Sequence, residues 1–199
     1  MEPPQKKKIL VIAGDFVEDY EIMVPYQAFL MVGHDVHVVS PGKAKGSTIK
    51  TAIHDFEGDQ TYTEKRGHNF IINEDFEQIR GEDYDGLYIP GGRAPEFLRL
   101  NQKVLDITKY FLEKEKPLAA ICHGIQVITA TNAIKDKKVT CYPACSPEVT
   151  LAQAHYQDVG FEDAVADGNL VTAKAWTSHP KFCQLFLERL GTGFCKKDK

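Results

Sequence analysis

The sequence has no long apolar run, and its first apolar segment, which begins at Ile9 after three lysines, is short. A membrane-spanning helix needs about 20 predominantly apolar residues, and a secretory signal needs a longer apolar core than this segment offers. We therefore expect a soluble protein of the cytoplasm, with entry into the nucleus left open, and no membrane partner.

The sequence also lacks a basic stripe. Its net charge is -4, and acidic and basic residues are interspersed along the 199 residues. Proteins that bind the phosphate backbone of nucleic acids gather Lys and Arg on one face or along one helix. A nucleic acid is therefore not an expected partner.

Cysteine is scarce and odd in number, and no second pair of cysteines or histidines accompanies the Cys141–Cys145 pair at the spacing of a zinc site. Without a secretory signal, reduced thiols are the expected state. We expect buried packing for this C-x3-C pair, no metal and no cofactor. The five cysteines are Cys122, Cys141, Cys145, Cys183 and Cys195.

Strand and helix patterns alternate along the chain. The run KILVIA at residues 8–13 is apolar on both faces, as is typical of a strand buried in a parallel sheet. Apolar residues at helical spacing over residues 20–32 end at Gly33, a residue favoured just past a helix end. Further strands are predicted at 35–40, 85–89, 118–121 and 139–142, and helices at 76–80, 102–114, 123–131, 147–154 and 179–190.

Two segments depart from this alternation. Residues 163–166 and 170–173 flank the turn signal Asp-Gly-Asn, which predicts an antiparallel hairpin. Residues 41–75 are rich in Gly, Lys and Thr, and we interpret them as an irregular excursion with a small hairpin. With no repeat or linker, the chain is expected to form one doubly wound α/β domain over residues 1–199, with its core at about 8–191.

Three polar segments follow predicted strands, at residues 14–21, 90–96 and 122–124. Ligands bind such sheets beyond the carboxyl ends of the strands, where the fold would gather these segments. Cys122 stands between a strand and a helix, as in the elbow that presents a nucleophile, and the helix N-terminus would favour its thiolate. Gly124 has no Cβ and would therefore allow close packing at this turn. The alternative is an inert buried cysteine.

The other candidates also have two interpretations each. His123 is either a proton carrier for Cys122 or an ordinary first-turn residue. Glu21 is either a carboxylic acid whose pKa is raised by the apolar IMVP run or one of several carboxylates that favour a helix start. Gly91 and Gly92 either leave amides free for a developing oxyanion or form a plain Pro-Gly-Gly turn.

The segments EDYEIMVPYQAF, YIPGGRAPEFLRLN and KPLAAICHG resemble the PfpI-like superfamily. This superfamily includes intracellular cysteine proteases, glutathione-independent glyoxalases and the parkinsonism-associated deglycase. The resemblance extends over residues 9–190. The segment TAIHDFEGDQTYTEKRGHNF is similar to the branch whose plant members often carry two such domains in tandem, whereas one copy is present here.

The resemblance implies a flavodoxin-like α/β fold, a three-layer sandwich with a mostly parallel central sheet, like class I glutamine amidotransferases. It implies Cys122 as nucleophile, Glu21 as neighbouring acid, His123 as general acid/base and an oxyanion site at the Gly92 and His123 amides. It also implies that Glu96 orients the histidine of an adjacent subunit, so that the protein is a homo-oligomer.

By the same resemblance, Trp176 and His179 would lie near the mouth of the pocket; a surface loop and a helix cap are the alternatives. The favoured function is a glyoxalase III type lyase. It would convert a small 2-oxoaldehyde such as methylglyoxal to the 2-hydroxy acid through a Cys122 hemithioacetal, with deglycation of early adducts as a related activity. The alternatives are an intracellular cysteine peptidase and a redox-sensing, chaperone-like stress protein without turnover.

Overall fold

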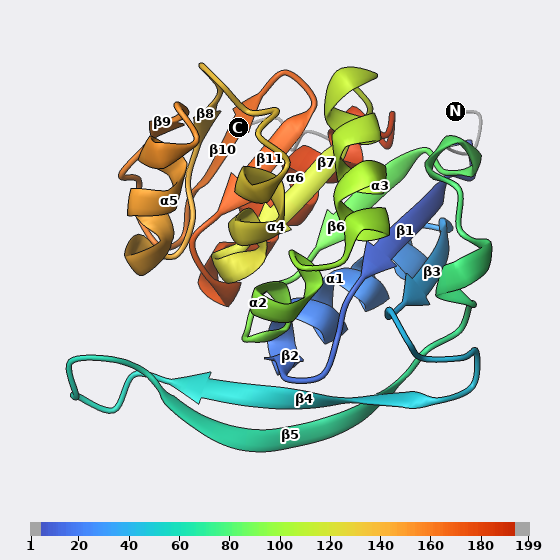
Figure 1. Ribbon diagram of the computed structural model, residues 1–199, viewed down its shortest axis with the longest axis horizontal. Coiled ribbons are helices and arrows are strands. Elements are labelled where there is room, and N and C mark those ends of the chain that lie inside the picture. The colour runs from blue at the N-terminus through green and yellow to red at the C-terminus, as the bar shows by residue number, and fades with distance from the viewer. Residues whose placement is uncertain (1–4, 194–199) are drawn as a thin grey trace, which may run out of the picture.

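The large sheet has the strand order β10-β11-β7-β6-β1-β3 in a computed structural model that describes residues 5–193 (Figure 1). Only β10 runs antiparallel, at the edge beside β11. Every residue of β6, β7 and β11 is buried, as in strands covered on both faces. The strands are β1 (Lys8–Ile12), β3 (Asp35–Val39), β6 (Gly86–Ile89), β7 (Leu118–Ile121), β10 (Ala164–Asp167) and β11 (Leu170–Ala173).

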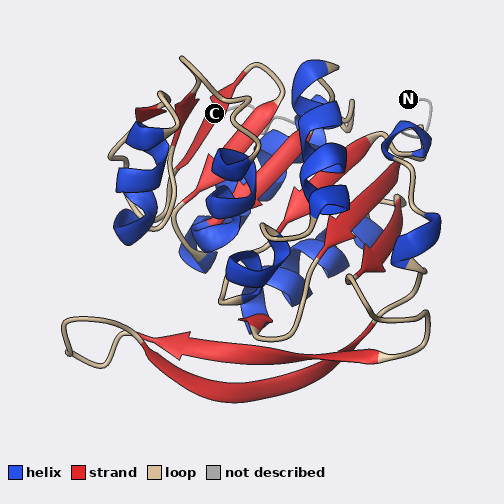
Figure 2. Ribbon diagram, viewed as in Figure 1, coloured by secondary structure: helices blue, strands red, loops and turns tan. Residues whose placement is uncertain are grey.

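Helices cover both faces of this sheet (Figure 2). The helices α1 (Asp19–Met31) and α6 (His179–Arg189) pack together on one face. The other face carries α3 (Gln102–Glu113) and α4 (Ile125–Ala130), with the short α2 (Ala94–Leu98) and α5 (Ser146–Leu151) beside α4. The expected flavodoxin-like three-layer sandwich is thus confirmed. Between residues 5 and 193, none of the helices has the length and apolar character needed to cross a membrane.

The small hairpin predicted within an irregular excursion at residues 41–75 is a long one, and it occupies much of that segment. Its strands β4 (Thr48–Asp55) and β5 (Thr63–Ile71) form a second sheet with the two-residue β2 (Val17–Glu18). Polar residues occupy most of β5, which is largely exposed, so an apolar strand pattern is absent there. Figure 1 shows the hairpin running below the carboxyl-terminal edge of the large sheet. The hairpin therefore lies where a ligand is expected to bind.

Several predicted boundaries also shift. The helix predicted at 123–131 begins as a 3-10 turn, Cys122–Gly124, before α4. The strand predicted at 139–142 shrinks to β8 (Lys138–Val139), which pairs with β9 (His155–Tyr156), because Pro143 opens a further 3-10 turn. The helix predicted at 76–80 is a 3-10 turn, Phe76–Gln78, followed by Gly81–Asp83, and a last one, Trp176–Ser178, precedes α6.

Candidate active site

A strained turn at Cys122 follows β7 directly. Cys122 has a φ of 58°, in the left-handed region that costs a residue with a Cβ about 1–2 kcal/mol. Ile121 before it is extended and Gly124 after it is helical, so the chain changes direction at the cysteine. A Cβ on Gly124 would clash with the backbone oxygen of Ile89. This is the backbone geometry of a nucleophile elbow, and Gly124 provides the close approach.

His123 contacts the sulfur of its own neighbour. Its Nδ1 lies 3.2 Å from the Cys122 Sγ, and its Nε2 lies 3.5 Å from the Tyr62 hydroxyl. The imidazole also stacks on Tyr142, with ring centroids 5.0 Å apart and planes at 20°. Burial and then the nearby His54 lower the pKa of His123 to about 4, so the ring is neutral near pH 7. A neutral Nδ1 can accept the thiol proton of Cys122.

Glu21 lies fully buried in the first turn of α1, beside the cysteine. The backbone N–H of Gly91 donates to its Oε2 at 2.8 Å. Burial and the charge of Glu18 raise the pKa of Glu21 well above its usual value, against opposing hydrogen bonds from Gly91 and Cys122. Burial therefore favours the protonated, uncharged form of this side chain.

Glu18 is the second buried carboxyl at this helix start. It caps α1 by accepting a 2.8 Å hydrogen bond from the backbone N–H of Glu21. Burial raises the pKa of Glu18 to about 7 despite this bond. Asp19, between the two, instead turns to the hairpin and contacts Thr51 and His68. The sequence singled out Glu21 alone among these carboxylates, whereas the fold buries Glu18 at the pocket as well.

Gly91 and Gly92 bring the chain that follows β6 against the cysteine. A Cβ on Gly91 would lie 2.7 Å from the Cβ of Cys122 and 2.6 Å from Oε2 of Glu21. Gly92 has a φ of 73°, which favours glycine. Its N–H and that of His123 both act to lower the pKa of the Cys122 thiol. These two amides are therefore available to a charge that forms at or near the sulfur.

Burial has a larger effect on the pKa of the Cys122 thiol than these two amides have. Burial first, and then the Glu21 charge, raise the pKa of the Cys122 thiol well above its usual value, although the amides of His123 and Gly92 act in the opposite direction. The amides at the start of this turn thus favour the thiolate, as expected, but burial and the Glu21 charge outweigh them in the free protein. Cys122 is only 7% exposed, so burial is the larger effect on the pKa of its thiol.

The hairpin covers a pocket next to the Cys122 sulfur. His54, Phe56 and Tyr62 come from the hairpin, and Phe56 stacks 5.8 Å from the Trp176 ring. Among the expected site residues, Cys122, His123, Gly92 and Trp176 line this pocket, and Glu21, Gly91 and Gly124 support it from behind. The residues lining it are Glu18, His54, Phe56, Tyr62, Gly92, Cys122, His123, Tyr142, Ala175 and Trp176.

Two expected residues do not line this pocket. Glu96 is exposed on α2. The pKa of Tyr62 is raised to about 12, first by burial, then by the charges of Cys122 and Tyr142, and then by that of Glu96. His179 is buried at the start of α6, and burial lowers its pKa to about 4. His54, Phe56 and Tyr62 were not predicted as site residues, because they belong to a polar stretch of the sequence. Isolated aromatic residues were the only signal in that stretch.

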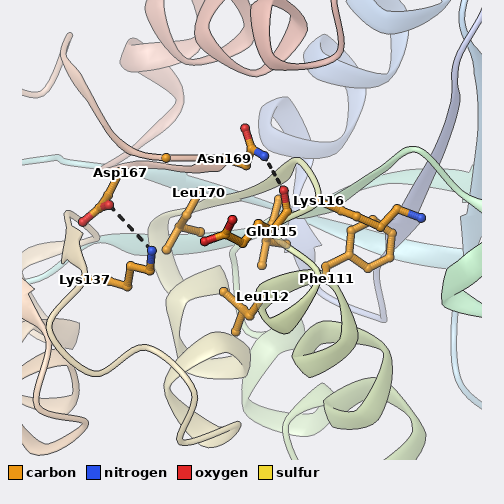
Figure 3. A pocket seen from close by; sticks show the side chains of 10 residues that line it. Phe111, Leu112, Glu115, Lys116, Lys137, Asp167, Asn169 and Leu170 are labelled. Atoms are coloured by element: carbon orange, nitrogen blue, oxygen red, sulfur yellow. Dashed lines mark hydrogen bonds and ion pairs between the residues drawn. The ribbon is translucent and has the colours of Figure 1, made fainter.

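The remaining described cysteines, Cys141, Cys145 and Cys183, are free and buried, and Cys195 lies outside the described residues. A separate depression lies at the opposite, amino-terminal ends of β7 and β11 (Figure 3). There Lys137 pairs with Asp167 at 3.8 Å, and no thiol or imidazole is among the lining residues. The pocket at Cys122 is therefore the candidate active site.

The chain belongs to the DJ-1/PfpI family, whose sequence profile matches residues 7–189. It is 46% identical over 186 residues to protein DJ-1 homolog D of Arabidopsis thaliana, which covers 93% of this chain and 48% of that relative. The chain thus spans about half the length of the Arabidopsis relatives that it matches.

Shorter relatives match over most of their length. A protein of Pyrococcus horikoshii named a deglycase is 31% identical over 167 residues, 84% of this chain and 89% of its own. The crystal structure of Drosophila melanogaster DJ-1beta superposes with a TM-score of 0.77 at 21% identity, covering 94% of this chain and 92% of that one. The latter similarity shows the fold alone.

Proposed function

We propose that this protein is a glutathione-independent glyoxalase, which converts a 2-oxoaldehyde such as methylglyoxal to the 2-hydroxy acid. The contact between the Cys122 Sγ and the His123 Nδ1, in a pocket backed by the buried Glu21, is the observation that carries this proposal. An aldehyde is electrophilic enough to react with a thiol that passes its proton to a neutral imidazole as it attacks.

The first step is addition of the sulfur to the aldehyde carbon, C1. A bond forms between Sγ and C1, the C1=O1 π bond opens, and the thiol proton passes through His123 to O1. The product is a hemithioacetal. The amides of Gly92 and His123, which favour negative charge on the sulfur, would stabilise charge that develops on O1.

The second stage moves hydrogen from C1 to C2. Glu21 or His123 removes the C1 proton and delivers a proton to C2, and an enediol forms between these two events. The collapse to a thioester and its hydrolysis by water release the 2-hydroxy acid and restore the thiol. All electrons remain within the substrate, so the conversion needs no external oxidant or reductant.

Deglycation of early adducts is a related activity of the same site. The archaeal relatives named deglycases support it. An early adduct of methylglyoxal with an amine or a thiol is a hemiaminal or a hemithioacetal, which releases the aldehyde reversibly. Adducts supplied with a trap for free methylglyoxal separate the two activities, because only direct deglycation continues when the aldehyde is trapped.

The test of the main proposal is lactate formation from methylglyoxal, in the presence of a chelator and without glutathione. The Cys122→Ala variant should lose turnover. Cys145→Ala is the matched control, because it removes a buried thiol from outside the pocket lining. No lactate from the intact, reduced protein would overturn the proposal.

We further propose that a second copy of the chain covers α2. Glu96 is exposed there beside Phe97 and Leu100, which are 62% and 79% exposed. Large apolar side chains exposed together are typical of an interface between subunits. Replacing Phe97 and Leu100 with serine should produce a monomer in light scattering, whereas an unchanged mass would place the interface elsewhere.

A further inference from the structure

We propose that His54 is a further catalytic residue of the Cys122 pocket, where it carries a proton between the two oxygens of the bound substrate. This inference rests on the glyoxalase function proposed above. His54 belongs to the hairpin rather than to the three polar segments at the strand ends. Its position suggests a task distinct from those of His123 and Glu21.

The position of His54 in the pocket is the first observation. The residue is 5% exposed, and it lines the same pocket as Cys122 and His123. Its ring packs edge-on against Tyr62, at 5.0 Å between centroids, and the Tyr62 hydroxyl in turn contacts the His123 Nε2. A substrate bonded to Cys122 would thus meet imidazoles from two different elements.

The second observation is how His54 is held. Its Nε2 lies 3.0 Å from Oε2 of Glu64, the residue directly opposite it on β5. Arg93 donates two hydrogen bonds to the same carboxylate, from Nε at 2.7 Å and from a terminal nitrogen at 2.8 Å. Partial burial raises the pKa of Glu64, but the hydrogen bonds from Arg93 and His54 lower it overall. Glu64 is therefore an ionised carboxylate.

An imidazole bound to a carboxylate through one nitrogen is a familiar proton-transfer device. The carboxylate fixes the proton on that nitrogen, directs the other nitrogen to the reacting group and stabilises the imidazolium when it forms. In His54 the bond to Glu64 uses Nε2, which leaves Nδ1 for the substrate. Because Arg93 immobilises Glu64, the ring orientation is set before the substrate arrives.

The proposed reaction has a proton transfer that suits this device. After the C1 proton leaves, negative charge lies on O2 and a hydroxyl remains on O1. The Nδ1 of His54 accepts the O1 proton, and the resulting imidazolium returns it to O2. The charge now on O1 closes the C1=O1 double bond of the thioester as C2 is protonated. His54 ends in its starting state, so the step is balanced.

The test is His54→Gln, studied in D2O with methylglyoxal as substrate. The glutamine amide nitrogen can take the position of Nε2 and keep the bond to Glu64, while no group remains to carry the oxygen-bound proton. General acid–base catalysis contributes about 10²–10⁴-fold, so we expect lactate formation to fall at least a hundredfold with little change in KM. His155→Gln, an exposed histidine outside the pocket, is the control.

Deuterium in the recovered substrate separates catalysis from structural support. The C1 proton can still be removed and replaced in His54→Gln, so exchange of deuterium into C1 should persist while lactate formation falls. If exchange and lactate fall together, or if turnover stays within twofold of the intact protein, the assignment of His54 is wrong. If the intact protein forms no lactate, it is the glyoxalase proposal that fails.

Discussion

The Nδ1 of His123 lies 3.2 Å from the Sγ of Cys122, although the two residues are adjacent in the chain. Neighbouring side chains diverge in a strand or a helix. The left-handed φ of Cys122 breaks that rule and brings the two side chains to one side of the elbow. Backbone strain at a single residue thereby creates a thiol–imidazole pair without a partner from a distant segment.

His123→Gln should therefore reduce turnover about a hundredfold, because the thiol loses the group that accepts its proton. The pKa of His123 is lowered to about 4, first by burial and then by the His54 charge. The imidazole should accordingly stay neutral, and catalytically competent, down to about pH 5. Lactate formation between pH 5 and 8 tests both statements. Activity in His123→Gln within twofold of the intact protein would contradict this role.

Gly91→Ala should inactivate the protein without a change of chemistry in the pocket. The added Cβ would lie 2.6 Å from the Glu21 Oε2 and 2.7 Å from the Cys122 Cβ, so Glu21 and Cys122 must move apart. Overpacking of this kind costs about 1–3 kcal/mol of stability. Gly193→Ala is the matched control, since nothing lies within 4 Å of its Cβ. Turnover and thermal unfolding of both variants provide the test, and an active Gly91→Ala would show that the contact is not needed.

The sequence predicted the sandwich and the elbow because both depend on local patterns. The run KPLAAICHG combines a buried strand with a cysteine at its end, and the structure places Cys122 directly after β7. The length of the hairpin was not predictable in the same way. Its strand β5 buries few side chains, and polar contacts such as that between Asp19 and Thr51, which have no periodicity, tie the hairpin to α1.

The protonation state of the site could not be read from the sequence either. The helix that follows Cys122 suggested a thiolate, yet burial of the sulfur raises the thiol pKa. Burial depends on segments far away in the chain, here β6 and the hairpin, which close over the elbow. In the acidic stretch EDYE, only the fold determines that Glu18 and Glu21 face inward while Asp19 turns to His68.

Glu18→Gln should stabilise the protein at pH 8 and change little at pH 5. The pKa of Glu18 is raised from 4.5 to about 7, so the folded state retains a proton that the unfolded chain releases above pH 4.5. Stability is therefore lost as the pH rises from about 4.5 to 7, and a glutamine avoids this loss while it can still cap α1. This shift corresponds to about 3 kcal/mol, so we expect Tm to rise by about 10 °C at pH 8. Equal gains at both pH values would contradict the proposed cause.

Glu21→Gln should lower the pH at which Cys122 is alkylated by iodoacetamide. The thiolate is the reacting form, and the charge of Glu21 is, after burial, the larger of the two remaining causes that raise the thiol pKa. Removing this carboxylate leaves burial in place, so we expect a shift of the alkylation profile rather than a return to that of an exposed thiol.

Cys183 provides an internal control in the same experiment. Burial alone raises its pKa to about 12, so its slow alkylation should not depend on residue 21. Mass spectrometry of both cysteines across pH 7 to 10 reports the two profiles from one sample. A profile for Cys122 that is unchanged in Glu21→Gln would mean that Glu21 keeps its proton across this range. Glu21 would then act on the substrate as an acid, and removal of the C1 proton would belong to His123.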